Sequence, residues 1–252
     1  MPGSARDRAR SDLAFSGGFL PSASPRPIDA STAVVTFVGA WIAAQIISSV
    51  ILVVLGDGDP ASEVTFGVLG VALTGAWESY LVGMWIASER AGSGSMIAVY
   101  GIAFRWVDRL GLAVGVGAQL VVIRVVYLPL EALWPDTFSE DRLTENAQDL
   151  VDRAGGASTL VLVAVVVFGA PIVEELFYRG LLQRSLADRF NEGAVLVLVA
   201  AVFAGVHFRP VEFPGLFVFG LILGWAAMRT RRLGPAITIH MGFNLTGLLL
   251  VL

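Results

Sequence analysis

Repeated long apolar stretches constrain this chain more than any other feature. A helix needs about 20 apolar residues to cross the hydrocarbon layer of a bilayer. The sequence therefore predicts an all-α fold, a polytopic transmembrane helix bundle of about seven spans. The predicted spans are Thr32–Leu55, Thr65–Ala87, Gly111–Leu133, Ser158–Tyr178 with an apolar continuation, Gly193–Phe208, Pro214–Met228 and Pro235–Leu252.

The composition agrees with a membrane protein. Hydrophobic residues make up 56% of the chain and charged residues 15%, whereas soluble domains carry about 25% charge. The formal net charge of −4 is too small to argue for nucleic acid, so the lipid bilayer is the expected partner. The chain has no cysteine, which excludes disulfides and thiolate chemistry and leaves histidine, carboxylate and amide groups as metal ligands.

Three regions follow one another along the chain. Residues 1–30 are polar and rich in Ser, Pro and Arg, and we expect a disordered cytoplasmic tail. Residues 31–157 hold the N-terminal spans and an acidic outer loop, and residues 158–252 hold the remaining spans. Most arginines fall in segments that lie inside if the N-terminus is inside. The sequence thus predicts a multi-pass protein of the cell membrane with a cytoplasmic N-terminus and an external C-terminus.

Ionisable side chains inside apolar helices are costly and mark functional sites by default. The fourth predicted span carries Glu174 and Glu175, the fifth carries His207, and the seventh carries His240. A rise of 1.5 Å per residue brings these groups to similar depths. Spacing alone does not show that they face one another.

Neighbours four residues apart on a helix suggest roles for these side chains. Glu175 is followed by Arg179, and this pair is most simply structural because a buried arginine needs a counter-charge. Glu174 points about 100° away and is the better candidate for a catalytic base that activates water. The two histidines are candidates for metal ligands or oxyanion stabilisers. Asn244, one turn after His240, is a candidate oxyanion donor or ligand.

The motifs resemble those of the CPBP family. They are Glu174-Glu175-x-x-x-Arg179, Phe203-x-x-x-His207 and His240-x-x-x-Asn244, in family order and each in an apolar helix. This family comprises the CAAX prenyl endopeptidases and the bacteriocin-processing or immunity proteins, often called Abi proteins. The resemblance covers residues 158–252, which we interpret as the catalytic core.

The resemblance implies an intramembrane endopeptidase that cleaves a peptide or membrane-protein substrate. Glu174 would activate the water, while His207, His240 and Asn244 would bind metal or stabilise the oxyanion. A divalent metal, with zinc as the candidate, would be held by Glu174, His207 and His240. The chain has no HExxH pair, so local spacing alone does not identify a zinc site.

Two other functions stay open from the sequence. A proton-coupled transporter would use the acidic pair together with Glu78 and Arg124, which lie in the second and third predicted spans. We expect Glu78 and Arg124 to form a structural ion pair. A catalytically silent immunity or scaffold protein would keep the fold and bind a partner. The oligomeric state and the substrate are not predicted.

Overall fold

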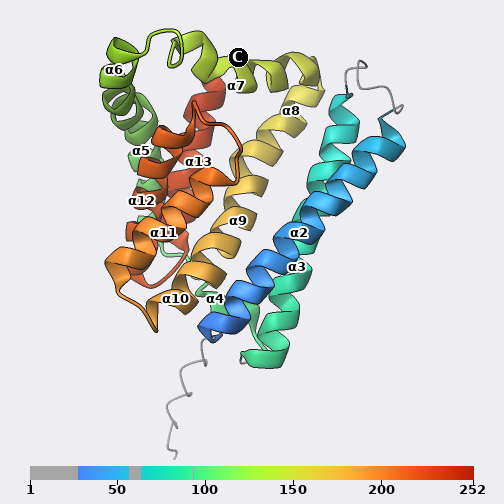
Figure 1. The fold of residues 1–252 in the computed structure, drawn as a ribbon, viewed down its shortest axis with the longest axis vertical. Helices are drawn as coiled ribbons and strands as arrows, with labels where there is room; N and C mark the ends of the chain where they lie inside the picture. Colours follow the sequence, from blue (N-terminus) through green and yellow to red (C-terminus); the bar gives the residue numbers. More distant parts are fainter. Residues whose placement is uncertain (1–27, 57–63, 93) are drawn as a thin grey trace, which may run out of the picture.

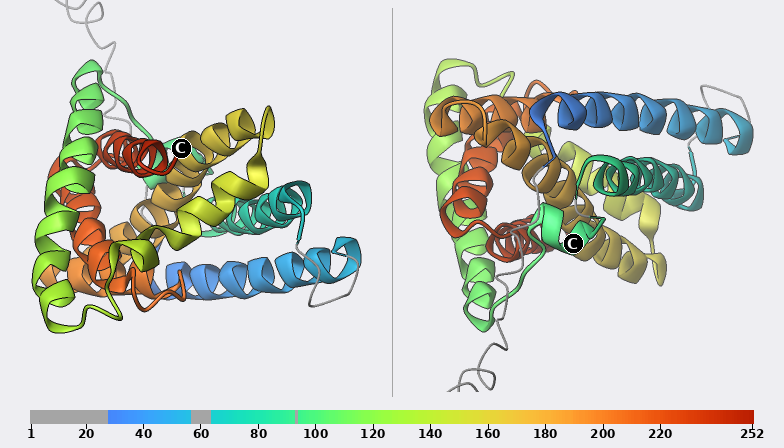
Figure 2. Two further views of the ribbon diagram at one scale, coloured as in Figure 1. Left: turned by 90° about the horizontal axis from the view of Figure 1, so that it is seen from above. Right: turned by 90° about the horizontal axis from the view of Figure 1, so that it is seen from below.

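The computed structural model describes residues 28–56, 64–92 and 94–252, which form helices and no strand (Figure 1). Nearly all of the predicted N-terminal tail lies outside the described residues. The all-helical prediction is confirmed for the part of the chain described. The helices form one bundle, with the α2–α3 hairpin leaning away from the others at one end (Figures 1 and 2).

Five helices within the described ranges are long and apolar enough to cross a membrane. They are α2 (Ala30–Leu55), α3 (Phe66–Ala91), the continuous helix Trp106–Leu133, the continuous helix Ser158–Ala187, and α12 (Phe213–Thr230). Two predicted spans are shorter, because α11 (Glu192–Gly205) has 14 residues and α13 (Gly234–Leu249) has 16. These five candidate spans agree with a multi-pass membrane protein, whereas the count of seven is not confirmed.

Both continuous helices contain turns wider than those of an α-helix. The first comprises the 3₁₀ turn η1 (Trp106–Arg109), α5 (Leu110–Gly117), the π segment η2 (Ala118–Val122) and α6 (Ile123–Leu133). The second comprises α8 (Ser158–Val163), the π segment η3 (Ala164–Gly169), α9 (Ala170–Glu175), the π segment η4 (Leu176–Gln183) and α10 (Arg184–Ala187). Because π segments in helices are frequent at functional sites, the stretch around α9 is of particular interest.

The acidic loop contains a helix, α7 (Glu140–Ala154), that caps one end of the bundle (Figures 1 and 2). Ser139 caps its N-terminus by accepting a hydrogen bond from the backbone N–H of Arg142. Arg153, in its last turn, donates to the carbonyl of Val64 just before α3. The loop is therefore an ordered part of the bundle.

Glycines allow α5 and α13 to pack with their backbones in contact. A Cβ on Gly115 would lie 2.6 Å from the backbone nitrogen of Phe243, and one on Gly111 would lie 3.0 Å from that of Ile239. Gly242 on α13 meets the backbone of Leu112 in the same way. Small residues let transmembrane helices approach closely. The contact through these three glycines therefore holds α13 against α5.

The α2–α3 hairpin packs through aromatic rings on the continuous helix Ser158–Ala187, which carries the paired glutamates. Phe177 of η4 stacks on Phe37 of α2 at 4.4 Å and on Tyr80 of α3 at 4.1 Å between centroids. Phe177 is fully buried by this packing. The three rings tie the hairpin to the helix that carries the paired glutamates.

A short helix, α4 (Met96–Tyr100), follows α3. It ends at Gly101, whose φ of 69° is a left-handed conformation suited to glycine. The carbonyl of Gly101 accepts a hydrogen bond from the backbone of Leu233 just before α13. Nearby, Arg232 forms an ion pair with Asp108 of η1.

The predicted ion pair between Glu78 and Arg124 is wrong. Arg124 instead lies 3.9 Å from Glu140 of α7, and Glu78 faces outward on α3. The prediction paired the two charges because they lie in neighbouring predicted spans, but the sequence did not give the order of the helices around the bundle. Because α3 packs on α2 and α6 lies near α12, the two residues are on different sides.

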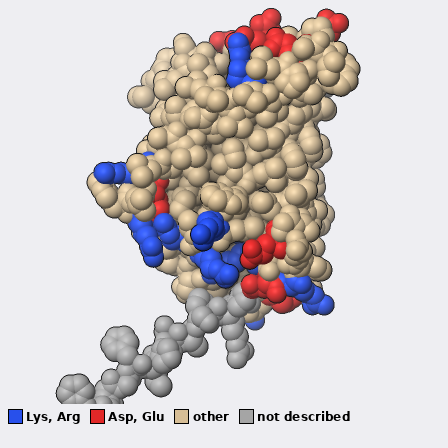
Figure 3. All heavy atoms as spheres, turned by 90° about the vertical axis from the view of Figure 1, so that its left-hand side faces the viewer, with Lys and Arg blue, Asp and Glu red and all other residues tan. Residues whose placement is uncertain are grey.

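On the face that Figure 3 shows, charged side chains lie at the upper end and in the lower half, with a band of few charges between them. The C-terminus lies at the end capped by α7, whereas α2 begins at the opposite end (Figure 1). This charge distribution is typical of a bundle that spans a bilayer.

Candidate active site

The paired glutamates end α9, between the π segments η3 and η4. Glu175 is fully buried, whereas the Glu174 side chain is 22% exposed. Pro171 occupies the first turn of α9. The two carboxylates therefore face different surroundings although they are neighbours in the sequence.

Glu175 joins two cationic or potentially cationic side chains. Its Oε1 lies 2.9 Å from Nη1 of Arg179 and 2.9 Å from Nδ1 of His240. The Glu175 and Arg179 side chains are fully buried, and that of His240 is 5% exposed. The predicted structural role of the Glu175–Arg179 pair agrees with this geometry, and the bond to His240 extends it.

Arg179 is held by α12 as well. Its Nη2 donates to the carbonyl of Gly220 at 3.2 Å, and its guanidinium lies 4.5 Å from the ring centre of Phe203. One turn on, Gln183 donates to the carbonyl of Gly224 at 2.9 Å. These contacts were not predicted, although the sequence contains a pattern for them. Arg179 and Gln183 lie four residues apart on one helix, and their acceptors Gly220 and Gly224 lie four apart on another.

His240 faces Glu174 with its other nitrogen. Nε2 lies 3.9 Å from Oε2 of Glu174. Because Glu175 is a carboxylate acceptor, it fixes the proton of a neutral imidazole on Nδ1 and leaves Nε2 with its lone pair. The rings of Phe219 and Phe203 meet the imidazole edge-on at 5.3 and 5.9 Å. His240 is thus oriented by its surroundings, with Nε2 toward Glu174.

His207 lies in the turn after α11, so the expectation that all three motifs lie in helices is wrong for this residue. Its Nδ1 donates to the carbonyl of Phe203 at 2.7 Å, and its ring meets that of Phe203 edge-on at 5.0 Å. Phe203 thus contacts both histidines. Among the described residues, His207 has no hydrogen bond or ion pair with Glu174 or His240.

The segment that carries His207 is held from outside the C-terminal region. Tyr127 of α6 donates to the carbonyl of Val211 at 2.7 Å, and Arg209 forms a hydrogen bond with Asn146 of α7. Glu212 follows, 3.6 Å from Arg209. Burial raises the pKa of Glu212, while Arg209 and His207 oppose the rise.

Asn244 is used in helix packing. Its side-chain amide donates to the carbonyl of Val166 in η3 at 2.8 Å. Because the residue in the widened η3 turn accepts this bond, Asn244 joins α13 to the helix of the glutamates. The structure thus brings Glu174, Glu175, Arg179 and His240 together, with His207 and Asn244 around them.

The candidate metal ligands suit a metal ion by their chemistry but not by their spacing. Both histidines direct Nδ1 to an oxygen acceptor, which leaves Nε2 as the nitrogen that metal ligands use. Within the described ranges, however, no group of three or more His, Cys, Asp or Glu side chains is placed to hold a metal ion. Glu174, His207 and His240 do not form a three-ligand site in this arrangement, and we derive no step through a metal.

Comparison with known proteins identifies a family for the C-terminal part of the chain. Residues 156–246 match the family model described as type II CAAX prenyl endopeptidase Rce1-like. The resemblance to the CPBP family is confirmed. The Rce1-like stretch includes all three motifs and the helices from α8 to most of α13, while α2–α7 lie outside it. No significant match was found among the curated proteins or the solved structures.

Proposed function

We propose that this protein is an intramembrane endopeptidase in which Glu174 activates a water molecule for attack on a peptide bond in or near the membrane. The observation that carries the proposal is the approach of Nε2 of His240 to Oε2 of Glu174 at 3.9 Å. A single water can hydrogen-bond to both atoms, because two bonds of about 2.8 Å reach across that distance.

The protonation pattern defines how such a water would be oriented. The Glu174 carboxylate and the unprotonated Nε2 are both acceptors, so the water donates one O–H to each. Its lone pairs then point away from both groups toward the substrate carbonyl. As the oxygen attacks, Glu174 takes the proton and later returns it to the leaving amine.

The buried pair of Glu175 and Arg179 supports this chemistry without contacting the substrate. Glu175 holds His240 by Nδ1 and is itself balanced by Arg179. A charged network in a low-dielectric site fixes the imidazole more firmly than a lone hydrogen bond does. We assign Glu175 and Arg179 as positioning residues. His207 and Asn244 are the proposed stabilisers of the oxyanion: His207 would donate from Nε2 in its protonated form, and Asn244 would donate the N–H that is not bonded to Val166.

The membrane topology belongs to the same proposal. We infer that α11 and α13 complete seven crossings, with the N-terminus cytoplasmic and the C-terminus outside. The start of α2 and the end of α13 at opposite ends of the bundle support an odd number of crossings (Figure 1). The expected partners are the lipid bilayer and a peptide or membrane-protein substrate.

The test is cleavage of a peptide library by the full chain in detergent or liposomes. Glu174→Gln is expected to lower the rate at least 100-fold, since a positioned base contributes about 10²–10⁴. Glu78→Gln is the matched control, because it removes an exposed carboxylate from α3. Retained hydrolysis in Glu174→Gln would refute the proposal. A zinc requirement stays a prediction, and an arm with a chelator tests it.

A further inference from the structure

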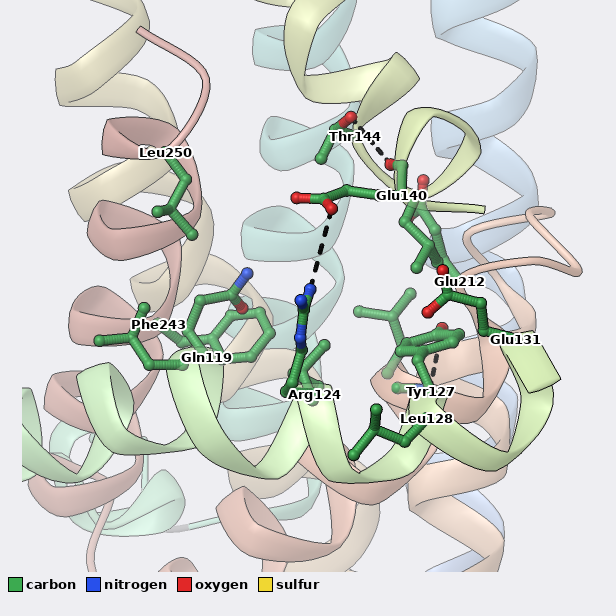
Figure 4. A pocket seen from close by; sticks show the side chains of 15 residues that line it. Gln119, Arg124, Tyr127, Leu128, Glu131, Glu140, Thr144, Glu212, Phe243 and Leu250 are labelled. Atoms are coloured by element: carbon green, nitrogen blue, oxygen red, sulfur yellow. Dashed lines mark hydrogen bonds and ion pairs between the residues drawn. The ribbon is translucent and has the colours of Figure 1, made fainter. Parts of the chain in front are cut away.

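A cavity lined by several charged residues lies outside the site described above. It has a volume of about 420 Å³ and lies between α6, α7, α12 and α13 (Figure 4). Four of its lining side chains are charged: Arg124, Glu131, Glu140 and Glu212. Phe243 separates it from His240, since the Phe243 ring stacks on Phe219, which in turn meets the imidazole. None of the charged lining residues takes part in the proposed hydrolysis.

The charged side chains of this cavity are only weakly paired with one another. Arg124 and Glu140 point toward each other across it (Figure 4), but their separation is 3.9 Å and their side chains are 67% and 76% exposed. An exposed pair of this kind contributes about 0–1 kcal/mol. Glu131 is also exposed and turned toward the cavity. Glu212 lies 3.6 Å from Arg209, which is outside the cavity. One guanidinium and two exposed carboxylates therefore remain, which favours a ligand that carries both an anionic and a cationic group.

The remaining walls are apolar and face the lipid side of the bundle. Leu120 and Leu128 line the cavity and are 50% and 55% exposed on a helix that is long enough to span a membrane. A ligand with hydrocarbon chains could place them along these leucines, whereas a water-soluble ion could not use them.

The spacing of the charged groups suits the head group of a phospholipid. Nη1 of Arg124 lies 3.9 Å from Oε2 of Glu140, so a cationic and an anionic side chain are close neighbours in this cavity. In a zwitterionic lipid only two carbons join the phosphate to the ammonium group, so these two groups are close neighbours as well.

We propose that this cavity binds the head group of a phospholipid with a primary ammonium group. Arg124 binds the phosphate, and Glu131 and Glu140 accept hydrogen bonds from the ammonium. A trimethylammonium head group has no N–H to donate, and an anionic head group without an ammonium group leaves both carboxylates without a partner. The cavity therefore selects phosphatidylethanolamine over phosphatidylcholine and phosphatidylglycerol.

Native mass spectrometry of the purified full chain tests this selection, with the three lipids carrying identical acyl chains. The wild type is expected to retain the ethanolamine lipid at least fivefold more than either of the others. The double variant Glu131→Gln with Glu140→Gln is expected to lose that preference, and Arg124→Gln to weaken retention of all three lipids.

Glu78→Gln is the control and is expected to keep the preference, because Glu78 lies on α3, outside this cavity. Thermal unfolding of each variant shows whether it is folded, and the substituted side chains are exposed. Equal retention of the three lipids by the wild type would overturn the proposal. So would a preference that survives in the double variant, or retention unchanged by Arg124→Gln.

Discussion

Oε1 of Glu175 lies 2.9 Å from Nδ1 of His240, although the two residues are 65 positions apart. The same oxygen lies 2.9 Å from Arg179. Glu175 therefore balances a buried guanidinium and orients an imidazole at once. Its neighbour Glu174 stays partly exposed and faces the opposite nitrogen of that imidazole. The two adjacent glutamates thus have separate roles: Glu175 positions His240, and Glu174 is the proposed base.

Substitution of Glu175 is expected to destabilise the fold. Glu175→Gln keeps the shape of the side chain but leaves Arg179 as an uncompensated buried charge. Breaking a buried ion pair on one side costs about 3–5 kcal/mol. Denaturant unfolding in micelles measures this loss against Glu78→Gln, which is expected to unfold like the wild type. A Glu175→Gln protein as stable as the wild type would show that the Arg179 charge is balanced in another way.

The contact between α5 and α13 predicts that alanine substitutions at two glycines of α5 change stability in opposite directions. Gly115→Ala introduces a Cβ against the backbone of α13, and such overpacking costs about 1–3 kcal/mol. Gly117→Ala meets nothing within 4 Å, and alanine's helix propensity predicts a gain of up to about 1 kcal/mol. The free energies of unfolding of the two variants test the contact between α5 and α13. Equal effects would argue against close backbone packing.

Asn244 predicts a smaller effect on stability. Asn244→Ala removes the bond to Val166, and hydrogen bonds between helices in membranes contribute about 0.6–2 kcal/mol. A loss of that size is expected in the free energy of unfolding. Asn146→Ala serves for comparison, because it removes a bond to Arg209 at an exposed site. If Asn244→Ala were no less stable than the wild type, the amide would not make this bond.

Glu212 makes stability depend on pH. Its pKa is raised above 4.5 by burial in the folded state, against the opposing effects of Arg209 and His207. The charged form is thus disfavoured in the folded protein, and the wild type loses stability as the pH rises through the raised pKa. Glu212→Gln should have a higher Tm than the wild type at pH 8. This difference should shrink toward pH 4.5, and thermal scans across that range measure it. A difference that is constant with pH would contradict the burial of this carboxylate.

Local spacing was enough to predict part of the site. Glu175 and Arg179 are four residues apart on one helix, so their pairing follows from helix geometry. The same geometry separated Glu174 from that pair. The bond from Glu175 to His240 could not be predicted, because depth in the membrane does not give the rotation of a helix or its neighbours. The error over Glu78 and Arg124 has the same cause.

The position of His207 and the number of spans show another limit. Apolar residues continue through Gly205 and Val206, so hydropathy placed the end of the fifth span too late. The helix ends at Gly205, and the imidazole lies in a turn held by Tyr127 and Asn146. Hydropathy measures the cost of burial in lipid, whereas the backbone turns soon after the helix end, with Phe208 at a left-handed φ of 54°. The π segments around α9 have no hydropathy signal either.

The central claim is that Glu174 and His240 act on one water, and a double-mutant cycle tests it most directly. Glu174→Gln removes the base, and His240→Asn keeps a donor for Glu175 while removing Nε2. Groups that act as a unit give non-additive losses. The rate of peptide cleavage is measured for the wild type, both single variants and the double variant. We predict that the double variant is no slower than the slower single variant, whereas losses that multiply would contradict the shared water.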